Sequence, residues 1–379
     1  MPDRSRNFPT SGRRAVVIGA GSFGTAIAVL LARGGLRTTL QTRTPQQAAE
    51  LQAARENAVY LPGITFPSDL RIDSADAGLA RADMVFIGVP SRGLDELLTT
   101  LPARGLRDRA AIISLAKGLV PPDGRAPSAV LTELFGEQRV AVIGGPAHAR
   151  EMVTEGAGLV AASANEELTH MVARTFIRAG VVCEESNDPV GVELAGAAKN
   201  AAALASGATE RQGLNAAGAA AGHIFAEVWR FAEQQGARPE SLIGLAGTGD
   251  LVATVLAPGS RNRRAGELLA DGIAAADIPA HIGQAVEALE SVPLLARALQ
   301  NAGLEAPVTS ALSRLIAGEL PLDDWVALVR TTVPPRARWR APVRRGFWRR
   351  VWARLRPQRP SVSLELPPAG GASGGEPSD

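Results

Sequence analysis

The chain contains only two lysines, Lys117 and Lys199, although 40 of its 379 residues are lysine or arginine. A group that exchanges a proton with a substrate can be a lysine amine but not a guanidinium, because the pKa of arginine stays above about 12. Two lysines can be chance survivors of an arginine-rich composition. They can also be the positions that a reaction requires, and this second interpretation predicts that both lie in one site.

A glycine-rich turn near the N-terminus has the spacing of a dinucleotide-binding motif. It follows the short apolar run of residues 15–18 and precedes the helical pattern of residues 25–32. The first glycine permits a tight turn, the second lets a diphosphate approach the backbone, and the third lets the helix pack closely on the sheet. The N–H groups at the start of the helix would bind the diphosphate. The predicted cofactor-binding residues of this turn are Gly19, Gly21, Ser22, Phe23 and Gly24.

The end of the second predicted strand bears on the choice between NAD and NADP. An acidic residue at this place would bind the ribose 2′-hydroxyl of NAD, but the residues here are Gln41, Thr42, Arg43 and Thr44. We therefore predict that Arg43 binds a 2′-phosphate and that the cofactor is NADP or NAD. A solvated surface arginine is the alternative.

Further turns follow the later predicted strands, at residues 89–91, 116–119 and 144–151. Ligands of open α/β sheets bind outside the carboxyl ends of the strands. Lys117 lies in the second of these turns, which places it at the predicted ligand-binding edge.

Several segments of the chain resemble segments of the NAD(P)-dependent glycerol-3-phosphate dehydrogenase family of bacterial type, and they follow one another in the same order. The resemblance covers residues 14 to about 330. Its segments are GAGSFGTA, VPS, AKGL, GGP, NDPVGVELAGAAKN, GDL, SRNRR and IGQAVE.

The resemblance implies reduction of dihydroxyacetone phosphate to sn-glycerol 3-phosphate, a precursor of phospholipids, and it implies roles for single residues. The catalytic set would be Lys199, Lys117 and Asp250, so that both lysines of the chain fall in it. The implied substrate-binding residues are Lys117, Gly145, Lys199, Asn200, Asp250, Ser260, Arg261 and Asn262. The implied cofactor-binding residues outside the glycine-rich turn and Arg43 are Lys117, Ala147, Arg261 and Glu287.

This residue set suffices for carbonyl reduction. Hydride transfer to a ketone leaves an alkoxide that needs a proton and a nearby positive charge. Lys199 would act as the general acid, Asp250 would orient it, and Lys117 would add positive charge. The guanidinium of Arg261 would bind the substrate phosphate through charge-assisted hydrogen bonds, and we expect no metal site.

The elements that must position these residues divide the chain in two. Short apolar runs alternate with helical patterns in the first half, which predicts a largely parallel sheet buried on both faces. Long Ala- and Gly-rich helical patterns follow, at residues 190–208, 216–235, 283–302 and 309–317. We predict an α/β fold, a Rossmann-like doubly wound sheet followed by an all-helical C-terminal domain. The predicted strands are residues 15–18, 38–41, 84–89, 110–115, 140–143, 158–162 and 181–184. The predicted boundaries are 1–12 for a flexible N-terminus, 13–188 for the dinucleotide-binding domain, 189–332 for the helical substrate domain, and 333–379 for a basic Trp-rich segment and disordered tail.

Charge separates the last segment from the rest. Residues 336–359 carry ten arginines and no acid, so a formal net charge of +2 leaves 2 − 10 = −8 for the other residues. We therefore expect no nucleic-acid face on the body. Residues 342–357 have the pattern of a short amphipathic basic helix that suits an anionic membrane surface. Nucleic acid, a protein partner or disorder are the alternatives for this segment.

We expect a cytoplasmic protein, with peripheral membrane contact as an open question. Arg13-Arg14 before an apolar stretch resembles an export signal, but the glycines there have the spacing of a phosphate-binding loop. The single Cys183 excludes an internal disulfide. The assembly state, monomer or homodimer, stays open.

Some residues depart from the family pattern. Residues 206–215 are shorter than the family's glycine-rich loop, and Ala217, His223 and Ala288 replace an expected basic residue, an arginine and a glycine. Two alternatives follow: a reductase of a related small phospho-ketone, and a catalytically impaired NAD(P)-binding regulatory protein.

Overall fold

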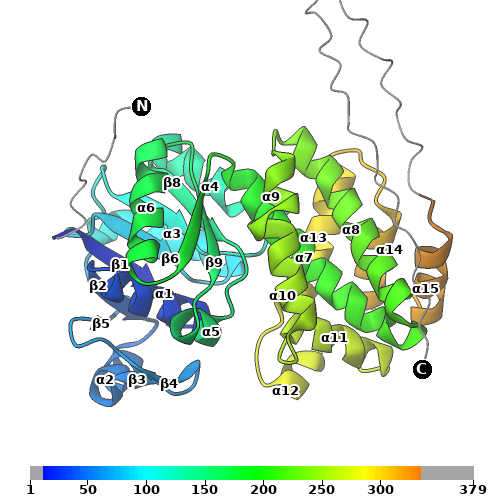
Figure 1. Ribbon diagram of the computed structural model, residues 1–379, viewed down its shortest axis with the longest axis horizontal. Coiled ribbons are helices and arrows are strands. Elements are labelled where there is room, and N and C mark those ends of the chain that lie inside the picture. Colours follow the sequence, from blue (N-terminus) through cyan, green and yellow to red (C-terminus); the bar gives the residue numbers. More distant parts are fainter. Residues whose placement is uncertain (1–11, 334–379) are drawn as a thin grey trace, which may run out of the picture. The chain divides into compact units, whose positions relative to one another are not determined.

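Eight strands form one sheet in the computed structural model, which describes residues 12–333 (Figure 1). Every pair of neighbouring strands is parallel except β8 and β9. The order across the sheet is β10-β9-β8-β7-β6-β1-β2-β5. The strands are β1 (Arg14–Ile18), β2 (Arg37–Thr42), β5 (Arg71–Ser74), β6 (Met84–Ile87), β7 (Ala111–Ser114), β8 (Val140–Gly144), β9 (Gly158–Ala162) and β10 (Val182–Ser186). The Rossmann-like fold class is confirmed.

The chain changes direction across the sheet at β1, which pairs with β2 on one side and β6 on the other. Such a switch point opens a crevice at the carboxyl ends of the two strands, where ligands of doubly wound sheets bind. The glycine-rich turn leaves β1 at this point.

Helices cover both faces of the sheet, as the continuous apolar strands require. One core contains buried side chains of α1 (Ser22–Arg33), α5 (Ala149–Thr154) and α6 (Glu166–Arg178). Another contains those of α3 (Leu94–Thr100) and α4 (Pro127–Phe135).

The elements between β2 and β6 were not predicted from the sequence. They are α2 (Pro45–Ala54), the hairpin of β3 (Glu56–Asn57) and β4 (Leu61–Thr65), and the edge strand β5. These strands are short, and β5 (RIDS) carries two charged residues, so none forms the apolar run by which the other strands were predicted.

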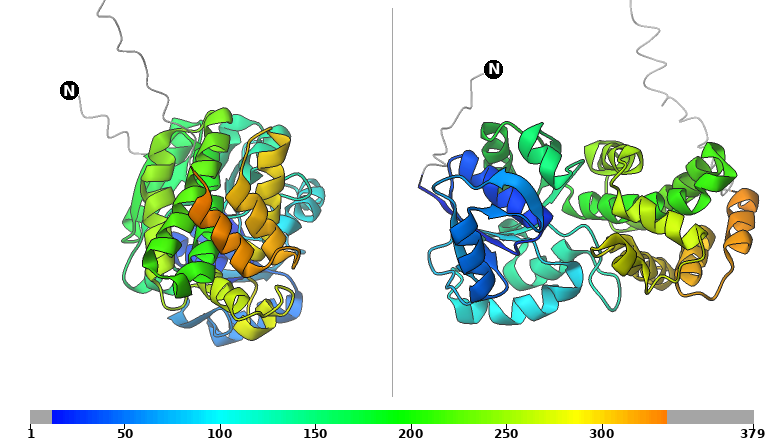
Figure 2. Two further views of the ribbon diagram at one scale, coloured as in Figure 1. Left: turned by 90° about the vertical axis from the view of Figure 1, so that its right-hand side faces the viewer. Right: turned by 90° about the horizontal axis from the view of Figure 1, so that it is seen from below.

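Helices alone follow β10, around the buried helix α7 (Pro189–Thr209) (Figures 1 and 2). Residues 191–209 of α7 are all buried, because its many Ala and Gly residues let other helices approach from every side. The longer helices of this half are α8 (Leu214–Gln234), α10 (Asp250–Leu256), α11 (Arg261–Ala270), α13 (Glu287–Asn301), α14 (Pro307–Ile316) and α15 (Leu322–Thr331); α9 (Pro239–Ile243) and α12 (Ile278–Ile282) are short.

Two sequence expectations for this half were wrong in detail. The helix predicted over residues 283–302 begins only at Glu287, because Gly283 has a φ of +75° and ends α12. The expected loop at residues 206–215 is mostly helical, since α7 continues to Thr209 and the 3₁₀ turn Glu210–Gln212 leads into α8. Ala217 and His223 both lie on α8.

Within residues 12–333, no single helix is both long and apolar enough to cross a membrane, although one bent pair, Pro239–Leu256 with Arg261–Ala270, has a suitable length and composition. Residues 1–11 of the predicted flexible N-terminus (1–12) lie outside the described residues, and so do residues 334–379, which include the predicted basic helix 342–357.

Glycines set the distance between α7 and α11, the helix that begins with Arg261. A Cβ added to Gly207 of α7 would lie 2.0 Å from the Arg263 carbonyl oxygen, and one added to Gly266 of α11 would lie 2.0 Å from that of Leu204. The two backbones are therefore in contact, and this contact holds the start of α11 beside the Lys199 helix.

We expect Gly207→Ala to lower the free energy of unfolding by roughly 1–3 kcal/mol, because the added methyl group has to push the two helices apart. Gly218→Ala is the matched control, since Gly218 lies inside α8 with no atom within 4 Å of its added Cβ. It should be neutral or stabilise by up to about 1 kcal/mol. Chemical denaturation of both variants checks this, and equal stabilities would contradict the tight crossing.

Candidate active site

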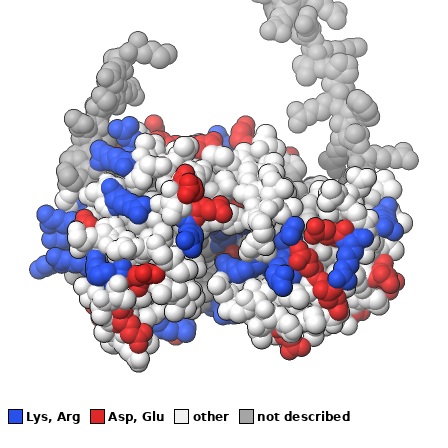
Figure 3. Space-filling view, turned by 60° about the horizontal axis from the view of Figure 1, so that its bottom comes forward, with Lys and Arg blue, Asp and Glu red and all other residues white. Residues whose placement is uncertain are grey.

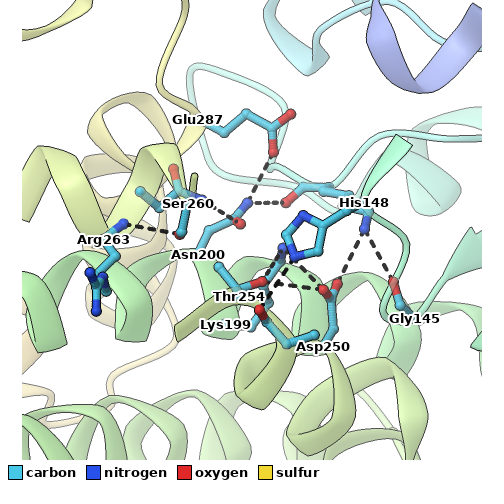
Figure 4. A network of polar contacts seen from close by, with 12 residues as sticks. Gly145, His148, Lys199, Asn200, Asp250, Thr254, Ser260, Arg263 and Glu287 are labelled. Carbon is cyan, nitrogen blue, oxygen red and sulfur yellow. Dashed lines mark hydrogen bonds and ion pairs between the residues drawn. The ribbon is translucent and has the colours of Figure 1, made fainter. Parts of the chain in front are cut away.

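The carboxylate of Asp250 lies between the only two lysines of the chain. Figure 4 shows it beside Lys199 and Thr254. Its Oδ2 atom is 3.2 Å from Lys117 Nζ, and its Oδ1 atom is 3.3 Å from Lys199 Nζ. Asp250 is 2 % exposed and Lys199 7 %. A solvent-facing Lys199 is therefore excluded, and the lysines do share one site.

Three separate elements deliver these charges. Lys117 follows β7, Lys199 lies in the middle of α7, and Asp250 is the first residue of α10. One helical turn after Asp250, Thr254 accepts a hydrogen bond from Lys199 Nζ at 3.1 Å and donates one to Asp250 Oδ1 at 3.3 Å. Thr254 was not predicted from the sequence, although its i+4 spacing from Asp250 puts both on one face of a helix.

Burial and charge together shift the pKa values of this cluster. Burial lowers the pKa of Lys199 below its ordinary value; Asp250 and Glu287 oppose this shift, while the positive charge of Lys117 adds to it. Burial alone would raise the pKa of Asp250, but Lys117 and Lys199 outweigh it and lower that pKa. The carboxylate therefore stays ionised, and the Lys199 ammonium is a stronger acid than an ordinary lysine.

Lys117 also contacts two other turns at this edge of the sheet. Its Nζ atom donates to the Gly145 carbonyl oxygen at 3.2 Å and lies 5.0 Å from the centre of the Phe23 ring. Gly145 has a φ of +99°, and a Cβ there would lie 2.3 Å from the Gly158 carbonyl oxygen. Lys117 thus links the glycine-rich turn, the end of β8 and Asp250.

Asn200, the neighbour of Lys199, is fully buried in a ring of hydrogen bonds. Its Nδ2 group donates to the Lys117 carbonyl oxygen at 3.2 Å and to Glu287 Oε2 at 3.1 Å, and its Oδ1 atom accepts from Asn262 Nδ2 at 2.8 Å. Asn262 Oδ1 accepts from the Ala288 N–H at 3.1 Å, which closes the ring beside Glu287. Both amide hydrogens of Asn200 are therefore used within the protein.

The SRNRR segment is not a solvated loop, because it caps and begins α11. Ser260 is buried and caps the helix by accepting from the Arg263 N–H at 3.3 Å. Arg261 is exposed, and its Nη1 group donates to Gln284 Oε1 at 3.1 Å and to the Ala285 carbonyl oxygen at 3.3 Å. The guanidinium therefore lies on the surface and has no hydrogen bond to the buried cluster of Lys117, Lys199 and Asp250.

A hollow of about 440 Å³ is lined by Arg150, Arg261 and Arg264 and by no acidic side chain. Ser22 from the glycine-rich turn and His281 also line it. Figure 3 shows Lys and Arg side chains on both sides of a hollow across this face. This charge suits the phosphates of a dinucleotide and of a small substrate.

The glycine-rich turn fits a dinucleotide. Gly19 has a φ of +111°, and a Cβ there would lie 2.6 Å from the Gly88 carbonyl oxygen. A Cβ on Gly24 would lie 2.1 Å from the Gly19 carbonyl oxygen, whereas Gly21 faces open space. The turn is therefore closely packed against the fold at Gly19 and Gly24, and it is open at Gly21, where a diphosphate would approach.

The remaining predicted residues lie at the same edge of the sheet. Arg43 directly follows β2 and is exposed. Ala147 lies in the turn after β8, next to His148, which the sequence analysis did not single out. The Nε2 atom of His148 is 3.3 Å from the Ala253 carbonyl oxygen on α10, beside Thr254 (Figure 4). The one sequence feature that could have predicted a site role for His148 is its position in a turn at the carboxyl end of a strand.

Comparisons with known proteins agree with this geometry. Residues 14–169 and 188–327 match the N-terminal and C-terminal parts of NAD-dependent glycerol-3-phosphate dehydrogenase. The chain is 36 % identical to glycerol-3-phosphate dehydrogenase [NAD(P)+] of Chlorobium luteolum, covering 84 % of this chain and 97 % of that protein. It is 38 % identical to that of Deinococcus radiodurans, covering 82 % and 92 %.

The crystal structure of glycerol-3-phosphate dehydrogenase from Coxiella burnetii has a TM-score of 0.80 and 30 % identity, covering 86 % of this chain and all of that one. A ketopantoate reductase from Ralstonia eutropha is less similar, with a TM-score of 0.53 and 19 % identity, over 82 % and 99 % of the two chains. The protein therefore belongs to the NAD-dependent glycerol-3-phosphate dehydrogenase family.

Proposed function

We propose that this protein is an active NAD(P)-dependent glycerol-3-phosphate dehydrogenase that interconverts dihydroxyacetone phosphate and sn-glycerol 3-phosphate. The observation that carries the proposal is the buried Asp250 carboxylate between Lys117 and Lys199. Oxidation of NADH or NADPH by the full-length protein on addition of dihydroxyacetone phosphate tests it. Cofactor binding without turnover would instead support the regulatory alternative.

The buried cluster supplies the proton chemistry of this reaction. The bound dinucleotide supplies the hydride that adds to the ketone carbon. Lys199 gives its Nζ proton to the ketone oxygen, so that an alcohol and a neutral amine result, and it takes the proton back in the reverse direction. Asp250 holds both amines, and Lys117 adds a positive charge that stabilises the developing alkoxide.

Other residues bind the two ligands in this proposal. The turn from Gly19 to Gly24 and Lys117, Ala147 and Glu287 bind the cofactor, and Arg43 selects its 2′-phosphate. Arg261, which lines the basic hollow, contacts both the cofactor and the substrate phosphate. The remaining substrate contacts are assigned to Gly145, Asn200, Ser260 and Asn262.

The proposed setting is the cytoplasm, where the product would serve phospholipid synthesis. Residues 342–357 are the segment that we propose for peripheral membrane contact. A homodimer is the proposed assembly if the chain associates, and sedimentation velocity of the full chain would detect it.

We expect Lys199→Met to lower kcat for dihydroxyacetone phosphate by at least about 10²-fold, because the ketone oxygen loses its proton donor. Cofactor affinity, measured by fluorescence titration, should stay nearly unchanged, since the amine acts on the substrate. Turnover close to that of the wild type would refute the assignment of the proton donor.

Arg261→Ala should raise KM for dihydroxyacetone phosphate steeply, because the phosphate loses a charge-assisted partner. The effect on dihydroxyacetone without phosphate should be small. Arg314→Ala is the control, since Arg314 is an exposed arginine elsewhere in the helical half. Equal losses with both substrates would show that Arg261 has a structural role only.

Arg43→Asp should shift the ratio of kcat/KM values from NADPH toward NADH, because a carboxylate repels the 2′-phosphate and can bind a ribose hydroxyl. Arg37→Asp is the matched control, because Arg37 is an exposed arginine at the opposite end of β2. The same ratio in the wild type and in Arg43→Asp would remove Arg43 from the cofactor site.

A further inference from the structure

Residues 116–128 lead from β7 into the first turn of α4 and include Lys117; we call this segment the strap. The strap belongs to the sheet half of the chain. Hydrogen bonds nevertheless join it to the helical half at three places along its length.

The three fastenings are spaced from one end of the strap to the other. Asn200 Nδ2 donates to the Lys117 carbonyl oxygen at 3.2 Å, and Arg297 Nη1 donates to the Pro122 carbonyl oxygen at 2.9 Å. At the far end the Ser128 N–H donates to both carboxylate oxygens of Glu193, at 3.1 and 2.9 Å.

Glu193 and Asn200 stand seven residues apart on α7. Two turns of an α-helix span about seven residues, so both side chains lie on one face of α7. This face thus holds the strap at both ends, while Lys199, next to Asn200, belongs to the reacting cluster. One rigid helix therefore sets the position of both lysines.

Glu193 provides an N-terminal cap for α4, whose own N-cap residue has no side chain that can accept a hydrogen bond. The helix begins at Pro127 after Ala126, and no side chain of the N-cap residue accepts a hydrogen bond from it. A carboxylate there satisfies a free N–H group and faces the positive end of the helix dipole. Glu193 thus replaces the missing cap from another part of the chain.

Burial of the Glu193 carboxylate is unfavourable, because the ionised group is removed from water. Burial raises the pKa of Glu193 to about 7, although hydrogen bonding from Ser128 and Ser114 favours the ionised form. A neutral amide could accept the same N–H without the penalty of a buried charge. An amide would nevertheless be the weaker cap when the carboxyl group is ionised, because it brings no charge to the positive end of the helix dipole.

We propose that Glu193 is a positioning residue for Lys117, which fastens the far end of the strap so that the ammonium stays against Asp250. Its effect on turnover rests on the proposed function, whereas the fastening itself does not. Glu193 contacts neither lysine directly, and it acts through the backbone of the strap.

Hydrogen exchange measured by mass spectrometry on the full chain tests the fastening without any substrate. Glu193→Gln keeps an acceptor but loses the charge, and Glu193→Leu loses both. Exchange in residues 116–128 should be faster in Glu193→Gln than in the wild type, and faster still in Glu193→Leu. Unchanged exchange of the strap in the folded variants would overturn the proposal.

Glu227 offers a matched control in the same half of the molecule. It is also buried on a long helix, and its carboxylate accepts from the N–H groups of Val308 and Thr309 at 3.0 and 2.9 Å. Glu227→Gln should speed exchange near residue 308 and leave both the strap and kcat as in the wild type.

A double-mutant cycle with Lys117→Ala then tests the catalytic consequence. Glu193→Gln should lower kcat for dihydroxyacetone phosphate roughly tenfold when Lys117 is present, since small misplacements of a catalytic group are costly. In the Lys117→Ala background the further loss should be under about twofold, because the group that Glu193 positions is gone.

The outcomes separate the two claims. Equal losses from Glu193→Gln in both backgrounds would show that Glu193 is structural and would overturn its role toward Lys117. A wild-type protein that does not turn over dihydroxyacetone phosphate would contradict the proposed function, while the exchange of the strap would still decide the fastening.

Discussion

The structure of the site depends on one buried carboxylate that holds two ammonium groups. An isolated buried charge costs several kcal/mol, so a carboxylate and amines at this depth are stable only together. Asp250 lies 3.2 and 3.3 Å from the two amines, and each charge comes from a different element. The sheet edge, α7 and α10 must therefore all be in place before the cluster can form.

The helix α7 organises these elements because nearly all of it is buried. Its small residues let α11 approach until the backbones touch at Gly207 and Gly266. One face of α7 then places Lys199 in the cluster, and Asn200 links Lys117, Glu287 and Asn262 through a ring of hydrogen bonds. The substrate-binding side chains assigned by resemblance are thus interdependent, and a change at one of them is expected to move the others.

Local patterns predicted much of the fold, and they failed where no local pattern exists. The seven apolar runs all appear as strands, because a parallel sheet buried on both faces needs them. The polar edge strand β5 and the short β3–β4 hairpin have no such run and were missed. Gly283 was predicted to lie in a helix, but its left-handed conformation ends α12 instead.

The site was predictable to the extent that its residue types are rare. Because the 379 residues include only two lysines, both were predicted to lie in one site. The resemblance to a known family implied Asp250 as their partner. Thr254 and Glu193 are common residue types whose importance comes from contacts across the fold. The pairing of Glu193 with Ser128, 65 positions away, has no signal in either local sequence.

The central claim is that Lys199 is the proton donor, made more acidic than an ordinary lysine by its burial. Its most direct test is the pH dependence of kcat/KM, which reports ionisations of the free enzyme and substrate, measured in both directions. The account predicts that reduction becomes slower as pH rises through a pKa below 10.5, where Lys199 loses its proton. Oxidation of glycerol 3-phosphate should become faster over the same range, because the neutral amine is then the base. If the residual activity of Lys199→Met showed the same pH dependence, Lys199 would not be the proton donor.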